Sequence, residues 1–563
     1  MKALFSSRAF LYRPAFLALF TADARRSFFS DLGAGVTVGI IALPLAIGFG
    51  MASGVAPGQG LWTAIVGGFI ISVFGGSRQQ IGGPTGAFVP VLAAVVAAHG
   101  YDGLALATLL AGLLLVLMGI FRLGALLRYI PYPVIAGFTS GIAVIIFLGQ
   151  LPEFLGLSFK RPGDAPELAW EVGKHLRELD WTAWPTWETP VVGGLGLLVV
   201  FLWPRLTRRV PAAIVAVVAT TLLVYFLQWP VATIGTRFGG LPSGFPDWHL
   251  PAISLEKLRA LAGSAFTIAA LGAIESLLSA TVADGMADTR HDSNSELIGQ
   301  GLANLAVPFV GGIAATGAIA RTAASIRSGG RSPLAGMVHA VVLLAFVLFA
   351  APLARFIPLA GLAAVLMGVA VRMAEWDTFR ELRRSSRSDF AVLLTTFVLT
   401  VVFDLTVGVA VGLVIAVVLF VKRMENISHV KLLTPDTDSE FDGSNSLRGK
   451  SIPDGVVLFR FEGPLFFAAV EKLEAALRAH AGKPRLVIFR LRHVPAVDAT
   501  ALHSLEVAVE KMHRDGVTIV LTAVQPQPMK VFYESGLAER IGLDNFCANL
   551  DEALVRAGVL LGK

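Results

Sequence analysis

The feature that most constrains this chain is a succession of long apolar segments that fills its first 421 residues. A helix needs about 20 mostly apolar residues to cross the hydrocarbon core of a membrane. Two of the segments, 84–98 and 317–328, are too short to cross as complete helices. Fourteen spans are predicted, at 32–51, 60–76, 84–98, 103–120, 131–150, 190–204, 210–228, 260–283, 297–313, 317–328, 333–352, 357–371, 389–404 and 405–421. The chain is therefore expected to be a polytopic α-helical membrane protein.

Charge is distributed unevenly between two regions. Residues 422–563 carry 18 Lys/Arg and 18 Asp/Glu, about one charge in four residues, as in a soluble domain. The preceding residues carry 28 Lys/Arg and 22 Asp/Glu, about one in eight, too few for a water-exposed surface of that size. The formal net charge of +6 thus belongs to the apolar region. It indicates membrane orientation, not a nucleic-acid partner.

Arginines alternate between the loops in a way that fits fourteen spans. Among the short loops that follow odd-numbered spans, Arg355 is the only Lys or Arg. Basic loops face the cytoplasm, so both termini are expected there, in a multi-pass protein of the cell (inner) membrane. The alternative is that arginines occur wherever a loop allows. The loops after even-numbered spans contain Arg78, Arg122, Arg128, Arg205, Arg208, Arg209, Arg290, Arg327, Arg331, Arg372, Arg380, Arg383, Arg384 and Arg387.

These patterns divide the chain into four parts. A cytoplasmic N-terminal segment is predicted at 1–30 and a transmembrane domain at 31–424. A linker, rich in Asp, Ser and Gly, is predicted at 425–450. A cytoplasmic domain is predicted at 451–563, where the apolar runs 456–461, 486–491 and 517–522 alternate with helical stretches at 468–480, 500–515 and 529–535. That alternation is typical of a small α/β domain.

The third and tenth spans carry related motifs. Gly82-Gly83-Pro84-Thr85-Gly86-Ala87-Phe88 opens one, and Thr316-Gly317-Ala318-Ile319, preceded by Gly311-Gly312, opens the other. Because the two spans are seven apart, the halves that contain them would have inverted orientations. Short, glycine-interrupted spans at corresponding places in two halves indicate the central site of a transporter. The alternative is a chance repeat of a tripeptide in a chain rich in Gly and Ala.

A short helix that begins within the membrane exposes unpaired N–H groups and about half a positive charge at its N-terminus. Two such ends facing each other form an anion site without a charged side chain. Candidate binding residues are therefore Thr85, Gly86, Ala87 and Phe88 in one half. Their counterparts are Gly317, Ala318 and Ile319, and Arg321 would add a full cation.

Glu275, in the predicted eighth span, is the other ionisable residue well inside the membrane. Such groups are costly to insert and usually serve a function, and a carboxyl in an apolar setting can hold a proton near neutral pH. Glu275 could couple transport to protons or act as a counter-ion of Arg321. A structural hydrogen bond to a neighbouring helix is the alternative.

Several other functions find no support in the sequence. There is no phosphate-binding loop of the Gly-x-x-x-x-Gly-Lys-Ser/Thr type and no His/Cys cluster with metal-ligand spacing. No cofactor and no metal site are therefore expected, and the protein is not expected to be an enzyme. Cys547 is the only cysteine, so no intramolecular disulfide can form, which fits a reducing compartment for the charged region.

The motifs resemble those of the sulfate permease (SulP) family of anion transporters over nearly the whole chain. Three stretches carry the resemblance: Gly39 to Pro44 in the first span, Phe74 to Pro84 before the third, and Gly317 to Gly336 in and after the tenth. The C-terminal region resembles the STAS domain of that family. The resemblance implies a 7+7 inverted repeat with core and gate domains, alternating access, and a homodimer. It also implies that the backbone at Phe88 and Ala320 contacts the anion, beside Arg321 and Glu275.

Two positions depart from the family pattern. Leu45 stands where sulfate-carrying relatives often have Gln after the first-span proline. Thr500 lies in Asp498-Ala499-Thr500-Ala501, where phosphorylated STAS relatives have Asp, two hydroxyl residues and Gly. Thr500 is thus a candidate regulatory phosphate acceptor, with a structural helix start as the alternative.

The leading hypothesis is a secondary active, proton-coupled transporter of a small anion of the carboxylate, bicarbonate, sulfate or chloride class. Its expected partners are that anion, the proton, membrane lipid and a second copy of the chain. One alternative is a nucleobase–proton symporter of the same architecture. Another is a membrane-anchored regulator whose C-terminal domain binds a partner.

Overall fold

A computed structural model describes residues 12–562, apart from 21, 126–129, 160, 161, 163, 180–184, 208, 209, 242, 243, 247, 249, 250, 252, 404, 435–437, 439–442 and 467–483. The chain forms two compact units, Met1–Val414 and Ile415–Lys563, and the boundary falls within helix α18 (Leu405–Ile427), which is named with the first unit. Each unit is described by itself. The helix predicted at 468–480 lies outside the described residues.

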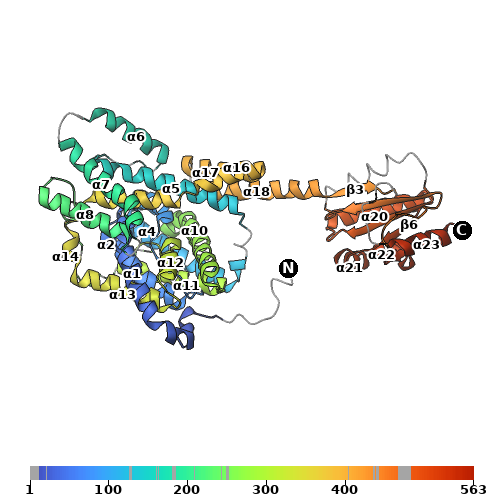
Figure 1. Cartoon of the computed structure of the whole chain (residues 1–563), viewed down its shortest axis with the longest axis horizontal. Helices are drawn as coiled ribbons and strands as arrows, with labels where there is room; N and C mark the ends of the chain where they lie inside the picture. The colour runs from blue at the N-terminus through green and yellow to red at the C-terminus, as the bar shows by residue number, and fades with distance from the viewer. Residues whose placement is uncertain are drawn as a thin grey trace. The chain divides into compact units, whose positions relative to one another are not determined.

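Helices make up nearly all of the first unit (Figure 1). A helix occupies each of the fourteen predicted positions, which confirms the polytopic α-helical fold. In chain order the elements are η1 (Ala15–Phe20), α1 (Ala22–Ala52), α2 (Pro57–Trp62), η2 (Thr63–Gly67), α3 (Gly68–Phe74), η3 (Gly86–Phe88), α4 (Val89–Ile120), α5 (Tyr132–Leu155), α6 (Ala165–Glu178), α7 (Pro185–Leu206), α8 (Ala212–Leu227), α9 (Ile234–Phe238), α10 (Leu255–Ala287), α11 (Ser293–Ala306), η5 (Val307–Val310), α12 (Ile319–Arg327), α13 (Leu334–Phe349), α14 (Ala351–Ala354), α15 (Leu359–Met373), α16 (Trp376–Ser385), α17 (Arg387–Val402) and α18 (Leu405–Ile427).

Within the described residues, eight helices are long and apolar enough to cross a membrane by themselves. The number of such helices is below the fourteen predicted spans for two reasons. The predicted third and fourth spans are joined in α4, where Gly100 leaves helical geometry with φ 67°, a conformation that glycine adopts without strain. Other predicted spans are short, among them α12 with nine residues and α11 with 14. The short tenth span is therefore confirmed as a half-helix.

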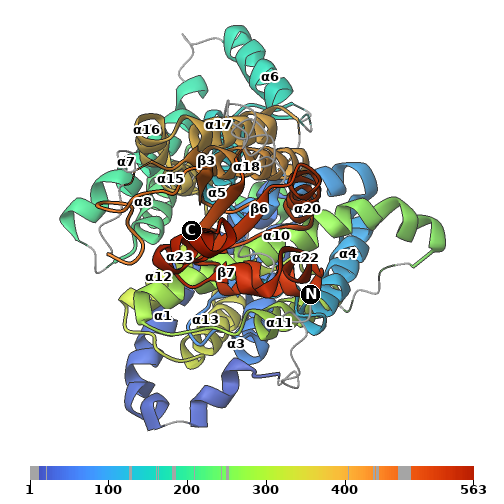
Figure 2. The ribbon, with the colours of Figure 1, turned by 90° about the vertical axis from the view of Figure 1, so that its right-hand side faces the viewer.

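The helices of the first unit form two groups, as expected for core and gate domains. In the core group, α4 packs against α10 and α11, and α1 against α13. In the gate group, α5 packs against α15 and α17, and α7 against α8 and α15. Figure 2 shows α1, α3, α11 and α13 gathered in the lower part of the unit and α5, α7, α8, α16 and α17 in the upper part. Each group contains members of both halves of the sequence.

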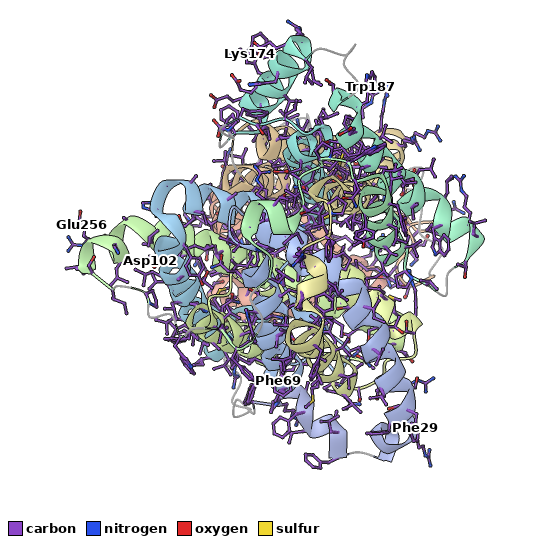
Figure 3. All side chains as sticks on the ribbon, turned by 90° about the vertical axis from the view of Figure 1, so that its left-hand side faces the viewer. Phe29, Phe69, Asp102, Lys174, Trp187 and Glu256 are labelled. Carbon is purple, nitrogen blue, oxygen red and sulfur yellow. The ribbon has the colours of Figure 1, made fainter. Side chains whose placement is uncertain are left out.

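Large apolar side chains project outward from many of these helices, as a lipid-facing surface requires. Phe29 at the start of α1 is 83% exposed, and Phe69 of α3 and Trp187 of α7 are also exposed. In Figure 3 all three point away from the bundle. Polar residues such as Lys174 of α6 and Glu256 at the start of α10 lie at the periphery of the same view.

The second unit contains a five-stranded sheet with strand order β3-β4-β5-β6-β7. Strands β4 (Val456–Glu462), β5 (Leu486–His493), β6 (Thr518–Thr522) and β7 (Phe546–Cys547) are parallel. Strand β3 (His429–Leu432), in the segment that the sequence suggested as a linker, pairs with β4 in the antiparallel sense. Helices α20 (Ala499–Arg514), α21 (Pro526–Glu534), α22 (Leu537–Ile541) and α23 (Leu550–Leu560) complete the unit. The predicted α/β alternation is confirmed at the three strands and two helices that the structure describes.

Candidate functional site

Two short extended segments cross in the core group. Strand β1 (Gly82–Gly83) pairs with β2 (Thr316–Gly317) in the antiparallel sense, with Gly82 opposite Gly317 and Gly83 opposite Thr316. Each segment is followed by a helix start, η3 and α4 after β1 and α12 after β2. The pairing therefore brings together the starts of two half-helices that lie more than 230 residues apart in the sequence.

Both half-helices begin without a side-chain cap in the described residues. Thr85 precedes η3 and Ala318 precedes α12 in extended conformation, and neither side chain accepts a bond from the first turn. The first N–H groups of a helix have no partner inside the helix. The Ala318 N–H donates to the Ile81 carbonyl at 2.8 Å, so at α12 the donors offered to an anion begin at Ile319. At the start of α12, Ala320 is exposed and Ile319 half-buried, so this helix end is accessible.

Arg321 lies within the first turn of α12 and is 2% exposed. Its Nη2 donates to the carbonyl oxygen of Pro84, just before η3. In the described part of the chain, Nη1 has no hydrogen-bond partner and the guanidinium forms no ion pair with a carboxylate. An uncompensated buried cation is costly, and a bound anion would reduce that cost. Arg321 thus joins the two half-helix starts and adds a full positive charge beside them.

Glu275 is buried in α10, and its partner is Thr85. The Thr85 hydroxyl donates to Glu275 Oε2 at 3.1 Å. Among the described residues no ion pair links Glu275 with Arg321. The carboxyl group is therefore connected to the start of one half-helix through a hydroxyl, so its protonation state can affect that helix end.

Hydroxyl groups that the sequence prediction did not identify hold the crossing together. Ser276 of α10 shares a hydrogen bond with Thr316 at 2.7 Å and accepts one from the backbone N–H of Gly317. Thr322 accepts bonds from the backbone N–H of Ile81 and from Ser279. Ser276 directly follows Glu275 in the sequence, and Thr322 directly follows Arg321. In the sequence, these two hydroxyl residues could have been recognised only by their position next to charged residues within predicted spans.

Close contact with other helices fixes the start of the third span. A Cβ on Gly86 would lie 2.7 Å from Ile146 of α5 and 3.3 Å from Phe49 of α1. Phe88 is buried, and a Cβ on Gly272 of α10 would lie 3.3 Å from its ring. Since α5 belongs to the gate group, the candidate residues Gly86, Ala87 and Phe88 lie where core and gate helices meet.

The other candidate positions lie outside this cluster. Leu45 is buried in an apolar cluster with Phe49 and Leu366. Thr500 is exposed in the first turn of α20, whose N-terminus is capped by Asp498 accepting from the backbone N–H of Ala501 at 2.7 Å. Across the described residues, no group of three or more His, Cys, Asp or Glu side chains could hold a metal ion.

Comparison with known proteins agrees with this architecture. The model of the sulfate permease family matches residues 28–396, and the STAS domain model matches residues 450–553. A putative sulfate transporter of Bacillus subtilis, YvdB, is 39% identical, over 94% of this chain and 97% of its own length. The bicarbonate transporter BicA of Picosynechococcus is 32% identical, over 94% of this chain and 95% of its own length.

Solved structures show the same fold. The transmembrane domain of a cyanobacterial BicA matches with a TM-score of 0.60 and 33% identity, covering 70% of this chain and 98% of that one. The murine Slc26a9 anion transporter in its inward-facing state matches with a TM-score of 0.84 and 18% identity, covering 99% and 97%. The chain therefore belongs to the sulfate permease family of membrane transporters and ends in a STAS domain.

Proposed function

We propose that this protein is a secondary active transporter of a small anion in the sulfate and bicarbonate class, working by alternating access. The anion binds between the starts of η3 and α12, at Thr85, Gly86, Ala87 and Phe88 on one side. On the other side Ile319, Ala320 and Arg321 bind it, while Gly317 and Ala318, whose N–H groups donate to Ser276 and Ile81, line the site. The proposal rests above all on one observation: two uncapped helix N-termini meet beside a buried arginine that lacks a carboxylate partner in the described residues.

The electrostatics of this arrangement favour an anion. Each helix N-terminus contributes about half a positive charge, and Arg321 contributes one more within one turn of Ala318. The relatives named for sulfate and bicarbonate transport suggest those two anions as the first to test. Carboxylates and chloride should also be tested, because backbone N–H groups do not by themselves distinguish one small anion from another.

We further propose that protons drive this transport through Glu275. In the described part of the chain, the buried Glu275 carboxyl receives one hydroxyl bond and no ion pair, so it can alternate between protonated and ionised forms without breaking an ion pair. Ionisation would add a negative charge one hydroxyl away from the start of η3, which weakens anion binding there. Uptake of a proton would therefore favour anion binding at the same site.

Orientation and assembly are part of the proposal. The arginine-rich loops support cytoplasmic N- and C-termini in the inner membrane. We also propose a homodimer embedded in membrane lipid, with the STAS domain and Thr500 as the regulatory part of the molecule. A nucleobase–proton symporter is not supported, because the relatives are named for anions and the cation Arg321 lies at the site.

Uptake into proteoliposomes tests the proposal. Labelled sulfate, bicarbonate, formate and chloride, each with and without an inward proton gradient, would show which anion is concentrated. Arg321→Gln is expected to raise KM about tenfold to a hundredfold, as for a lost bond to a charged group. Arg327→Gln, at the exposed end of the same helix, serves as the matched control. Uptake that is unaltered by Arg321→Gln would contradict the proposed site.

A further inference from the structure

One face of α11, the ninth span, carries three polar residues at successive helical turns. Glu296, Gln300 and Asn304 are spaced i, i+4, i+8, and all three are fully buried. Hydrogen bonds connect successive turns of this face, the second of them to the backbone carbonyl of Gln300. Gln300 Nε2 donates to Glu296 Oε1 at 2.8 Å, and Asn304 Nδ2 donates to the carbonyl of Gln300 at 2.9 Å. We call these three residues the α11 polar face.

At the C-terminal end of the α11 polar face, Asn304 binds the segment that leads to α12. Asn304 Nδ2 donates to the carbonyl of Ala315, and Asn304 Oδ1 accepts from the backbone N–H of Ala315, both at 2.8 Å. The amide thereby pairs with Ala315 as a neighbouring β-strand would. Ala315 directly precedes β2, so this pair of bonds fixes the residue from which the second half-helix start is built.

At the N-terminal end of the α11 polar face, Glu296 binds the segment that leads to η3. Glu296 Oε2 accepts from the backbone N–H groups of Gly76 and Ser77 at 2.8 and 2.9 Å. Close backbone contact reinforces the arrangement. A Cβ on Gly299 would lie 2.5 Å from the backbone N of Gly75, and one on Gly301 would lie 2.6 Å from the carbonyl of Gly112 in α4. Helix α11 is thus fixed both to the loop before η3 and to the helix that continues from it.

We infer that Glu296, Gln300 and Asn304 are positioning residues that set the separation of the two half-helix starts, and with it the affinity for the anion. This inference rests on the proposed transport function. None of the three needs to touch the anion, since they act through Ala315 and through Gly76 and Ser77. The backbone N–H groups of the proposed site cannot adjust as a flexible side chain can, and small misplacements of binding groups are costly.

Kinetics of sulfate and bicarbonate uptake separate positioning from general support of the fold. Asn304→Ala removes both bonds to Ala315 and is expected to raise KM at least about tenfold while Vmax stays within about twofold of the unmodified protein. Asn304→Asp keeps the acceptor for the Ala315 N–H and should give a smaller rise. Leu302→Ala, a half-buried truncation on the same helix, is the matched control and should leave KM unchanged.

Hydrogen exchange of the full chain in detergent provides a readout that does not depend on the anion. Asn304→Ala should increase exchange in a peptide covering 313–318, and Glu296→Gln in one covering 75–83, with α13 unaffected. Unchanged exchange in these peptides overturns the inference even if no tested anion is transported. Faster exchange with an unchanged KM for the anion also overturns the inference. So does an Asn304→Ala protein whose only kinetic change is a fall in Vmax equal to that of Leu302→Ala. Faster exchange together with a raised KM supports it.

Discussion

Thr85 donates a hydrogen bond to the carboxylate of Glu275 across 3.1 Å, although the two residues are 190 positions apart. Thr85 directly precedes η3, and Glu275 lies in the middle of α10. The contact therefore connects the acid of the eighth span to the backbone that we propose binds the anion. It also explains how a carboxyl group could influence an anion site without forming an ion pair with Arg321.

Glu275→Gln is expected to abolish the dependence of anion uptake on the proton gradient. Glutamine keeps an acceptor for the Thr85 hydroxyl but cannot bind or release a proton near neutral pH. Anion exchange at equal pH on both sides should persist, as measured by counterflow in proteoliposomes. Glu256→Gln, at the exposed start of the same helix, is the control. A Glu275→Gln protein that still concentrates anion with the gradient would exclude this role.

Gly83→Ala is expected to destabilise the membrane unit by about 1–3 kcal/mol, the usual cost of a non-glycine residue in a strained backbone region. Gly83 has φ +142°, and a Cβ there would lie 2.7 Å from Arg321 Nη1 and 3.2 Å from Ala64 Cα. Gly263→Ala, in a helical position with open space around it, should stabilise α10 by about 0.5–1 kcal/mol. Thermal unfolding in detergent compares the two, and equal melting temperatures would contradict the expectation.

Asp498→Ala is expected to cost about 1 kcal/mol of stability in the STAS domain, because it removes the side-chain acceptor that caps α20. Thr500→Ala should change stability by less than about 0.5 kcal/mol, since Thr500 is exposed. Hydrogen exchange of α20 in the full chain measures both. The result also bears on regulation. If Thr500→Ala does not change stability, the Thr500 hydroxyl is not needed to start the helix and could serve another role.

Burial raises the pKa of the Cys547 thiol, and the nearby Glu552 carboxylate raises it further. A raised pKa means that less of the thiol is ionised at a given pH, and the thiolate is the reactive form. Alkylation by N-ethylmaleimide at pH 7 should therefore be slower than for free cysteine and should accelerate as pH rises. Because Cys547 is the only cysteine, mass spectrometry of the intact chain reports its rate directly. A rate equal to that of free cysteine would refute the prediction.

Much of this protein follows from its sequence alone. Helical structure at the fourteen predicted positions, the short α12, and the STAS strands and helices that the structure describes all agree with the sequence-based predictions. They depend on the length of apolar runs and on local periodicity, which a sequence displays directly. Arg321 and Glu275 were identified for a similar reason, since ionisable residues are rare in membrane spans.

The tertiary structure decided how those parts meet. The pairing of Gly82 and Gly83 with Thr316 and Gly317, the contact of Thr85 with Glu275, and the bond from Arg321 to Pro84 all join residues of different spans. Asn304 was not identified at all, because a polar residue in an apolar span does not reveal which backbone group it will bind. Apolar segment length determines which residues enter the membrane. Which of those residues come together at the candidate site depends on the pairing of backbone groups, because no water is available to bond those groups inside the membrane.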